Sequence, residues 1–508
     1  QDTPNAAYCV RGADIVPITN HNFTDIPQRY VCDRTKETKL LAAGDLVIEK
    51  SGGSPTQSTG RIVYVSEDLI KAKGNVVCSN FCTAFRVKAG WNPLYVYYFW
   101  QNVYNHGAFF NFEGKTSGIK NLQLDNALSA IDIEYLPLEK QNQIVASLAS
   151  IDEKIKVNRQ INDNLEAMAK QLYDYWFVQF DFPNEEGKPY KSSGGAMVWN
   201  EKLKREMPQG LGAPKIGDIE KNIITGKTPS CADEDNFGGD IPFVTIDDIR
   251  GNLFVFEAQR TLSTKGADSQ EKKYLPIGSL SVSCIGTIGV MGFVAKLAQT
   301  NQQINSIVFE HEYNKEFLYF SLRLYFENAK AKTGNVFANM SKEEFASIIV
   351  AYPPKQILQA FHNKVAPIFD SIKNNTEEIN SLTKQRDELL PLLMNGQASV
   401  NYHLSASTSI SFDISVLFLN FTNGNSLYET ISLDYQCFAL PLHSKENTHG
   451  TIQEDKRHIQ QRQRQGDKHA RERFLAFFYK CTSTIHQAAF GNAWCYRGYK
   501  GKNISESK

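Results

Sequence analysis

An internal repeat constrains the fold of this chain more than any other feature of its sequence. Residues of the first half return in the second half, in the same order and at two constant spacings. The spacing of 234 positions relates Val10 to Val244, Asp14 to Asp248, Ile15 to Ile249, Gly44 to Gly278 and Gly52 to Gly286. The spacing of 217 positions relates Ile155 to Ile372, Asn158 to Asn375, Leu165 to Leu382 and Leu172 to Leu389. The two halves therefore carry the same parts and differ by a net 17 residues (234 − 217).

The second part of each half has the hydrophobic spacing of a coiled coil. Apolar residues and asparagines alternate there by four and three, which places them along one seam of a long helix. The seam comprises Ile151, Ile155, Asn158, Leu165 and Leu172 in the first half, and Ile368, Ile372, Asn375, Ile379, Leu382 and Leu389 in the second. Two seams of matched length predict a helix pair, either parallel or antiparallel.

Asn158 and Asn375 occupy equivalent positions in the two seams. A buried asparagine in a seam fixes the register of the helices at some loss of stability. Alternatively, each asparagine faces solvent at a frayed helix start. The sequence leaves both interpretations open.

The first part of each half has the pattern of a small mixed module. Short β-rich runs such as Asp45-Leu-Val-Ile48 and Leu280-Ser-Val-Ser283 are separated by Gly, Ser and Pro turns, and each module has one helix-like stretch, at 94–104 and 317–326. The predicted class is α/β (mixed α+β), with two small modules and two long helices. The predicted segments are a first module at 1–137, a helix at 138–183, a connector at 184–213, a second module at 214–353, a helix at 354–396 and a tail of unknown role at 397–508.

Composition excludes several classes of protein. Lys+Arg and Asp+Glu both number 55, so any contact with nucleic acid has to come from locally placed basic groups. Nine cysteines without paired spacing argue against a disulfide framework and a zinc site, and favour a reducing compartment. The absence of an apolar run of membrane-spanning length predicts a cytoplasmic protein.

Known catalytic motifs are incomplete in this sequence. Gly226-Lys-Thr228 ends like a phosphate-binding loop, but Lys221 stands where the first glycine belongs and Pro229 would interrupt the helix that follows. Tyr352-Pro-Pro354 has only part of the strip found in amino-methyltransferases, and no Gly-rich cofactor loop accompanies it. We therefore predict a chain without catalytic residues, a bound metal or a cofactor.

Two matched pairs of loops have residues suited to DNA. One pair follows the strands that begin near Gly44 and Gly278, where glycines either form tight turns or bring backbone N–H groups close to a phosphate. The other pair combines lysine and threonine with Asn121 or Asn339, which either reads an adenine edge or caps the next helix. The candidate DNA-binding residues are Lys50, Ser51, Gly52, Gly53, Lys115, Thr116, Lys120, Lys227, Thr228, Gly286, Thr287, Lys332 and Thr333.

In this order and repeated, these motifs resemble the specificity subunit of type I restriction-modification systems over residues 8–396. The resemblance rests on Gly44-Asp-Leu46, Lys50-Ser-Gly-Gly53, Leu136-Pro-Leu-Glu-Lys-Gln141, Ile216-Gly-Asp-Ile219, Gly226-Lys-Thr-Pro-Ser230, Ile241-Pro-Phe-Val244 and Pro353-Pro-Lys-Gln356. It implies target-recognition domains that read a bipartite site in double-stranded DNA, with the coiled coil setting the spacing between the two parts.

The resemblance also implies the partners. Modification (methyltransferase) subunits bring S-adenosylmethionine, and restriction (endonuclease/translocase) subunits bring ATP and Mg²⁺, in a bacterial or archaeal defence against phage. The chain departs from the family in three places: its first module lacks the opening strands, Leu211 stands where a Trp is usual, and the tail beyond Val400 has no counterpart. An incomplete or silent recombination copy, a complete enzyme and a scaffold without DNA binding remain as alternatives.

Overall fold

The computed structural model describes residues 6–53, 57–116, 119–333 and 339–398. The tail predicted at 397–508 lies outside the described residues from position 399 onward. We call residues 6–137 module 1 and residues 214–353 module 2. None of the helices in the described ranges combines the length and the apolar composition that a bilayer crossing requires.

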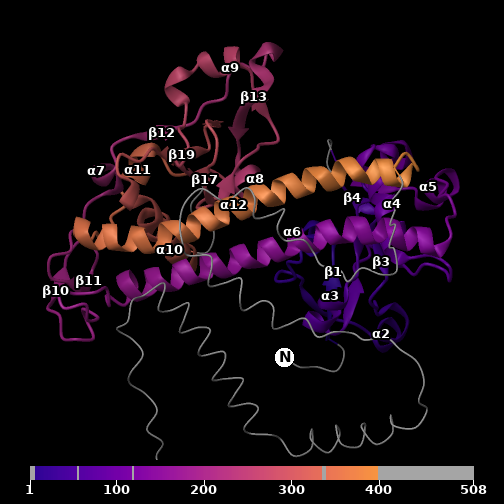
Figure 1. The fold of residues 1–508 in the computed structure, drawn as a ribbon, viewed down its shortest axis with the longest axis horizontal. Helices are drawn as coiled ribbons and strands as arrows, with labels where there is room; N and C mark the ends of the chain where they lie inside the picture. Colours follow the sequence, from indigo (N-terminus) through magenta and orange to yellow (C-terminus); the bar gives the residue numbers. More distant parts are fainter. Residues whose placement is uncertain (1–5, 54–56, 117–118, 334–338, 399–508) are drawn as a thin grey trace, which may run out of the picture. The chain divides into compact units, whose positions relative to one another are not determined.

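Module 1 contains three small sheets and five helices among its described residues, in agreement with the predicted mixed class (Figure 1). The sheets have the strand orders β2-β1-β6, β5-β3-β7 and β4-β9-β8. The elements are β1 Ala6–Val10, α1 Ile15–Thr19, β2 Gln28–Tyr30, α2 Asp33–Lys39, β3 Leu46–Glu49, β4 Ser51–Gly52, β5 Ile62–Tyr64, α3 Glu67–Lys73, β6 Val76–Cys78, β7 Cys82–Phe85, α4 Pro93–Asn105, β8 Glu113–Thr116, β9 Ile119–Leu122 and α5 Leu124–Ala130.

Module 2 contains eight strands among its described residues, against nine in module 1. Its two sheets have the orders β12-β19-β16-β17-β14 and β15-β13-β18. The elements are α7 Ile216–Ile219, β12 Ile223–Thr225, β13 Phe237–Val244, α8 Ile246–Ile249, β14 Phe254–Val255, β15 Thr261–Leu262, α9 Thr264–Asp268, β16 Leu280–Ser283, β17 Met291–Val294, β18 Gln299–Thr300, β19 Ile304–Ile307, α10 Lys315–Thr333 and α11 Lys342–Ala346.

The strands of the two modules pair in the same register. The pair β1 and β6 is parallel with Val10 opposite Cys78, and β13 and β18 are parallel with Val244 opposite Thr300. The central strands β3 and β7 set Ile48 opposite Thr83, while β16 and β19 set Val282 opposite Asn305. Because a slip of one residue would turn every side chain to the other face of a sheet, this agreement shows that the sequence repeat is a repeat of structure.

Local sequence explains where the long helix of module 1 begins. Asn92 caps α4 by accepting hydrogen bonds from the backbone N–H groups of Leu94 and Tyr95, and Pro93 occupies the first turn, where its missing N–H has no consequence. Tyr95, Tyr98 and Trp100 on this helix are buried in the core of module 1. The equivalent helix α10 buries Phe317, Leu318 and Phe320 in module 2.

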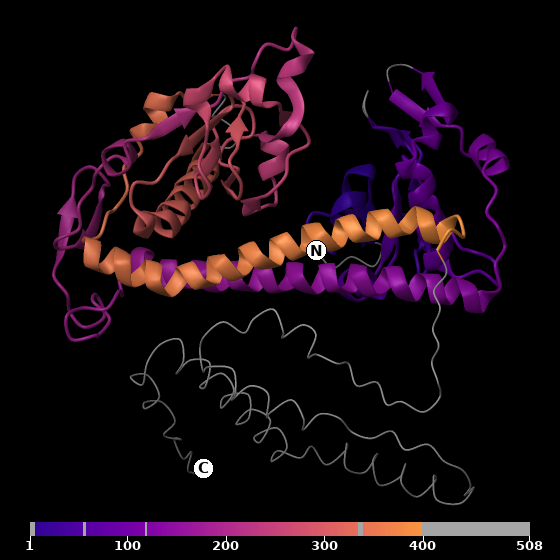
Figure 2. The ribbon, with the colours of Figure 1, turned by 45° about the horizontal axis from the view of Figure 1, so that its top comes forward.

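Two long helices, α6 (Leu138–Tyr173) and α12 (Lys355–Met394), lie side by side and antiparallel (Figure 2). Val145 and Leu148 near the start of α6 share the core of module 1 with Leu390 and Leu393 near the end of α12. At the other end, the last residues of α6 and the first turns of α12 share the core of module 2. Each module therefore packs on both helices, which resolves the choice between parallel and antiparallel pairing.

The segment after α6 is more structured than the sequence suggests. The helix continues as a π-helical turn over Asp174–Val178, which buries Trp176 and Phe177. The segment at 184–213, predicted as a polar connector, contains the antiparallel hairpin of β10 (Met197–Asn200) and β11 (Arg205–Pro208). Neither strand alternates between buried and exposed residues, since Val198 and Trp199 are both exposed and Met207 and Pro208 are both buried, so the hairpin has no period-two pattern in the sequence.

Candidate nucleic-acid interface

The structure brings together two loops of module 1 that lie about seventy positions apart in the sequence. Strand β9 is central in a small antiparallel sheet, with β4 on one side and β8 on the other. Ser51 lies opposite Asn121, and Gly52 lies opposite Lys120. Lys115 and Thr116 belong to β8, so seven of the predicted residues, Lys50, Ser51, Gly52, Gly53, Lys115, Thr116 and Lys120, lie in or beside one sheet.

One backbone position organises this region in the same way in both modules. In module 1 the N–H of Lys50 donates to the carbonyl of Phe81 (2.8 Å), and the carbonyl of Lys50 accepts from the N–H of Leu122 (2.7 Å). In module 2 the N–H of Cys284 donates to the carbonyl of Gln303 (2.8 Å), and its carbonyl accepts from Met340 (2.8 Å). We call Lys50 and Cys284 the node residues.

These bonds correct part of the sequence interpretation. The N–H groups of Lys50 and Ser51 both point to the carbonyl of Phe81, at 2.8 and 3.1 Å, so neither is available to a phosphate. The side chains differ at the node, because Lys50 is half-buried while Cys284 is 2% exposed, and burial raises the pKa of the Cys284 thiol to about 11. The common backbone therefore carries a different side chain in each module.

Lys120 has a structural partner that the sequence did not reveal. Its ammonium lies 2.9 Å from a carboxylate oxygen of Glu113, and the two side chains are 14% and 5% exposed. The ammonium also lies over the ring of Phe110, 5.0 Å from its centroid. A phosphate contact by Lys120 would have to compete with this largely buried ion pair, which counts against Lys120 as a DNA contact.

The conformation of Gly52 has a cause within the protein. Its φ is +142°, and a Cβ atom there would lie 2.8 Å from Oε1 of Glu49. Glu49 is buried and accepts two hydrogen bonds from Arg61, at 2.6 and 2.8 Å. The glycine thus makes room for a buried ion pair, which favours the structural explanation of this loop over a phosphate cradle.

A groove beside the node residue of module 1 is lined by cationic and polar side chains. Its volume is about 670 Å³, and Lys39, Lys50, Arg86 and Asn80 are among the residues that line it. Arg86 is paired with Asp45, whose carboxylate lies 2.6 Å from Nε. Lys39 and Lys50 form no ion pair with any residue that the structure describes. Their charges are therefore available to an anion.

In module 2 three of the predicted residues are exposed, namely Lys227, Gly286 and Thr287, and Thr228 is half-buried. The backbone N–H of Lys227 donates to the carbonyl of Thr300 (2.9 Å), which holds the segment next to β18. Lys332 and Thr333 lie in the last turn of α10. The continuation of this second loop at 334–338 lies outside the described residues.

The predicted helix caps at Asn121 and Asn339 are wrong. Asn121 lies in β9 and accepts a hydrogen bond from Ser51 (2.5 Å), while α5 begins after Gln123, whose side chain makes no cap. Ser341 caps α11 by accepting from the N–H of Glu344. Asn339 instead pairs with Ile285 in the same bridge that joins Asn121 to Ser51. The sequence could not distinguish these roles because both asparagines lie just before a helix.

Comparison with known proteins identifies the family. A family model described as the type I restriction modification DNA specificity domain matches residues 22–167 and 213–387, more than half of the 508 residues. The chain belongs to this specificity family. It is 31% identical over 324 residues to the type I restriction enzyme HindI specificity subunit of Haemophilus influenzae, a match that covers 54% of this chain and 70% of the relative.

Two further proteins are similar to this member of the specificity family. The type I restriction enzyme MjaIX specificity subunit of Methanocaldococcus jannaschii is 25% identical over 295 residues, which cover 54% of this chain and 62% of the relative. The crystal structure of the S subunit of a type I restriction-modification system from M. genitalium aligns with a TM-score of 0.41 at 14% identity, covering 76% of this chain and 88% of that one.

In this specificity subunit every predicted seam residue except Leu389 is buried or half-buried, and Leu172 and Ile368 pack against the core of module 2. Leu389 is 37% exposed, and its neighbours Leu390 and Leu393 are buried against module 1 instead. The seven-residue spacing assumes that a helix is the partner, but this end of α12 packs on a module, so the buried face moves by one residue. Ile155, Asn158, Ile372 and Ile379 are buried, and Ile151, Leu165, Leu172, Ile368, Asn375 and Leu382 are half-buried.

The side chains of both seam asparagines form hydrogen bonds across the helix pair, and neither lies at a frayed helix start. Nδ2 of Asn158 donates to Glu378 (2.7 Å), and Nδ2 of Asn375 donates to Oδ1 of Asn162 (2.9 Å). Asn158 is 7% exposed. Because each bond requires one particular alignment of α6 and α12, the asparagines favour a single register.

An ion pair adds to the same register near module 1. Arg386 on α12 lies 3.0 Å from Asp152 on α6, and the hydroxyl of Tyr98 donates to the same carboxylate (2.6 Å). Burial and the Asp152 charge raise the pKa of Tyr98, so this hydroxyl stays protonated. The seam and module 1 are therefore locked together through Asp152.

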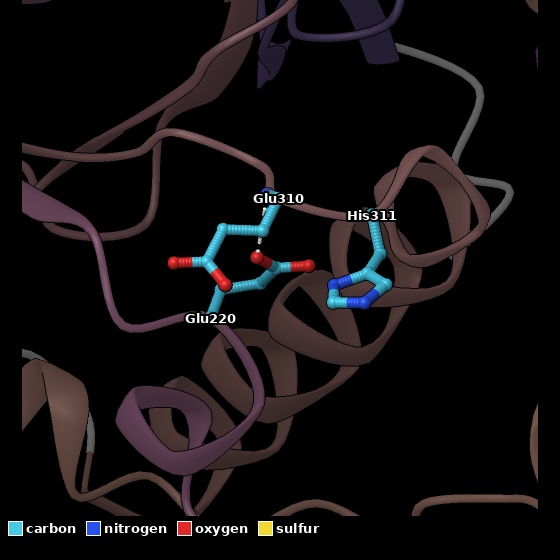
Figure 3. Close-up of side chains that lie close together, drawn as sticks. All are labelled: Glu220, Glu310 and His311. Atoms are coloured by element: carbon cyan, nitrogen blue, oxygen red, sulfur yellow. Dashed lines mark hydrogen bonds between the residues drawn. The ribbon is translucent and has the colours of Figure 1, made fainter.

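The described residues hold one cluster with the composition of a metal site, formed by Glu220, Glu310 and His311 (Figure 3). Glu220 is fully buried, but its two oxygens accept hydrogen bonds from the N–H of Glu310 (2.8 Å) and from Nδ2 of Asn314 (2.7 Å). Glu310 and His311 are exposed. The buried carboxylate thus serves to hold the chain between β19 and α10.

Proposed function

We propose that this chain is the sequence-specific DNA-binding subunit of a type I restriction-modification complex. It reads a bipartite site in double-stranded DNA, one part with each module, and directs methylation or cleavage by its partner subunits. The observation that carries the proposal is the repeat itself. Two modules with the same strand register present different side chains at equivalent positions, as two readers of two different sequences require.

The helix pair supplies the fixed spacing that a bipartite site needs. A helix of 36 residues is about 54 Å long, which exceeds one turn of duplex DNA at about 34 Å. The bonds of Asn158, Asn375 and Arg386 across the seam favour one alignment of the helices. Bases between the two recognised parts would remain without contact.

The chemistry belongs to the partners in this proposal. Modification subunits supply S-adenosylmethionine and the methyl-transfer site, and restriction subunits supply ATP-driven translocation and Mg²⁺-dependent cleavage. The chain itself contributes recognition only, without a catalytic residue or a bound cofactor. Such a complex would act on cellular and invading DNA in the cytoplasm of a bacterium or archaeon.

Methylome mapping tests the function. We expect that co-expression of the full chain with the modification subunits of its own system, in a host without DNA methylation, produces modified adenines at one bipartite motif. A complex that copurifies and leaves the genome unmodified would contradict the proposal and support a silent copy or a scaffold. Methylation by the purified chain alone would contradict its non-catalytic role.

The spacing is tested by lengthening both helices at matched positions. Insertion of seven residues between Asp163 and Asn164 in α6, and of seven between Lys373 and Asn374 in α12, keeps the heptad phase and lengthens each helix by about 10 Å, or about three base pairs. We expect a longer spacer with both recognised parts unchanged. The control is the insertion in α6 alone, which misaligns the seam and should reduce methylation without creating a new spacer. A double insertion that alters the recognised parts but not the spacer would refute the role of the helices.

A further inference from the structure

A four-residue β-turn lies beside the node residue in each module, at 79–82 and 301–304, and equivalent backbone bonds hold the two turns. The N–H of Ser79 donates to the carbonyl of Val10 (2.8 Å), and the N–H of Cys82 closes the turn on Ser79 (3.0 Å). The equivalent bonds of module 2 join Asn301 to Val244 (3.3 Å) and Ile304 to Asn301 (3.3 Å). With the bond from each node residue, both turns share three equivalent backbone bonds, and in module 1 the N–H of Ser51 adds a fourth.

Each turn presents an exposed carboxamide at the same position, Asn80 in module 1 and Gln302 in module 2. The side chain of Asn80 forms no hydrogen bond within the described ranges. Oε1 of Gln302 accepts from the hydroxyl of Thr228 (2.8 Å), which orients the amide and leaves the Nε2 hydrogens available. Recognition of a base requires a polar side chain on a rigid backbone, with hydrogen-bonding groups that are free or already oriented. The amides of Asn80 and Gln302 meet this requirement.

The neighbouring residues of each turn are occupied within the protein. Nδ2 of Asn301 donates to Oε1 of Gln303 (3.1 Å), so these two side chains brace the turn of module 2. In module 1 the hydroxyl of Ser79 lies 3.7 Å from the sulfur of Cys82. Phe81 is apolar and 55% exposed. Among the four positions, the second is the one where both modules place an amide that faces solvent.

Lysine residues lie beside both turns. Lys39 and Lys50 line the same groove as Asn80, and the exposed Lys227 adjoins Thr228, the partner of Gln302. Lysines that bind phosphates position a protein on the duplex, while amide groups of Asn or Gln can pair with both N6 and N7 of adenine in the major groove. The two kinds of contact lie next to each other in both modules.

We propose that Asn80 and Gln302 are specificity-determining residues, each reading one adenine in its own half of the bipartite site. This inference rests on the proposed function and names the residues that carry it out. It predicts that the two positions act independently, because they belong to different modules.

Isosteric substitutions test the inference without removing a side chain. Asn80→Asp and Gln302→Glu keep the shape of the residue but replace the amide donor by a carboxylate, which accepts from N4 of cytosine and repels N7 of adenine. At one position of one half-site, we expect Asn80→Asp to reduce the preference for adenine over the other bases by about 5- to 150-fold, measured as methylation of sites that differ only there. Gln302→Glu should do the same in the other half-site.

Matched controls place the same change elsewhere on each module. Asn75→Asp alters an exposed asparagine at the opposite end of β6, and Gln259→Glu alters an exposed glutamine of module 2 that is not part of the turn. Both controls should leave the motif unchanged. A clear bipartite motif for the wild-type chain that stays unchanged in both Asn80→Asp and Gln302→Glu would overturn the inference and leave the proposed function intact. A loss that is equally large for sites with adenine and for sites with any other base at every position would also overturn it, because a phosphate contact does not depend on the base.

Discussion

Modules 1 and 2 use different polar contacts at the end of their central strands. The last residue of the central strand is Glu49 in module 1 and Ser283 in module 2, and each reaches the strand that follows. Glu49 forms a buried ion pair with Arg61, whereas the hydroxyl of Ser283 accepts from the backbone N–H of Val290 (2.9 Å) and donates to the carbonyl of Thr287 (2.5 Å). We call the polar contact made by this last strand residue the clasp. The loop that follows the strand is longer in module 1, so a longer side chain is needed to reach across it. The backbone arrangement is therefore the same in both modules, while the clasp differs.

A similar exchange occurs where each module meets the helix pair. In module 2, Nδ1 of His362 on α12 lies 2.7 Å from a carboxylate oxygen of Glu316 on α10. The positions that correspond to these two in module 1 are Val145 and Leu94, both part of its apolar core. At this one position the contact is polar in module 2 and apolar in module 1, so the repeat keeps the geometry here while the chemistry differs.

The largest expected difference between the modules follows from the Glu49 clasp. Glu49→Ala would leave the guanidinium of Arg61, only 17% exposed, without its partner. Loss of one member of a buried ion pair costs about 3 to 5 kcal/mol. We expect hydrogen exchange in module 1 to accelerate strongly in denaturant while module 2 keeps its protection.

Two variants sharpen this prediction. Ser283→Ala removes the equivalent clasp of module 2 and should cost only about 1 to 3 kcal/mol, confined to module 2, because it leaves one backbone N–H unsatisfied. The double change Glu49→Leu with Arg61→Leu removes both charges and should recover much of the lost stability. Equal destabilisation of both modules by Glu49→Ala would show that they do not unfold separately.

A smaller difference is expected in the response to pH. The hydrogen bond with Glu316 raises the pKa of His362, so its stabilising effect is complete below the unfolded value near 6.5 and is lost as pH rises through the folded pKa. Burial and the charge of Lys156 lower the pKa of His21 in module 1. The unfolded chain then binds the extra proton, so stability in module 1 is lost as pH falls from about 6.5 through the lowered pKa.

Exchange measurements at pH 5.5, 6.5 and 8 check these signs. With the intrinsic exchange rate corrected at each pH, module 2 should lose protection from pH 6.5 to 8, and module 1 should lose it from pH 6.5 to 5.5. His362→Gln should abolish the first change, and His21→Asn the second. Parallel pH profiles in the two modules would contradict the comparison.

Sequence alone could establish the parts that depend on local periodicity and on the repeat. The two long helices, the strands at 46–49 and 280–283 and the helix beginning at Pro93 follow from apolar spacing and capping residues close in the chain. The antiparallel pairing could not be predicted, because a seam pattern reads the same in both directions. The prediction that Leu389 lies in the seam was wrong for a related reason, because sequence spacing does not show which element a residue packs against.

The candidate site was harder to predict because its contacts join distant segments. Lys120 looks like a free lysine until β8 brings Glu113 beside it, and Ser51 meets Asn121 only through β4 and β9. Asn80 and Gln302 carried no signal of their own, as each is one polar residue within a short turn. Aligning the repeat across the turns would have found them, because both positions then carry an amide.

The three backbone bonds that both turns share have an evolutionary consequence. They involve main-chain atoms, which every residue except proline supplies, so folding exerts little selection on the side chains at Asn80 and Gln302. Substitutions at these positions can accumulate without loss of stability. Selection then acts on them only through the DNA sequence that is methylated. A lineage under attack could thus change its target by a single codon, without rebuilding the protein that presents it.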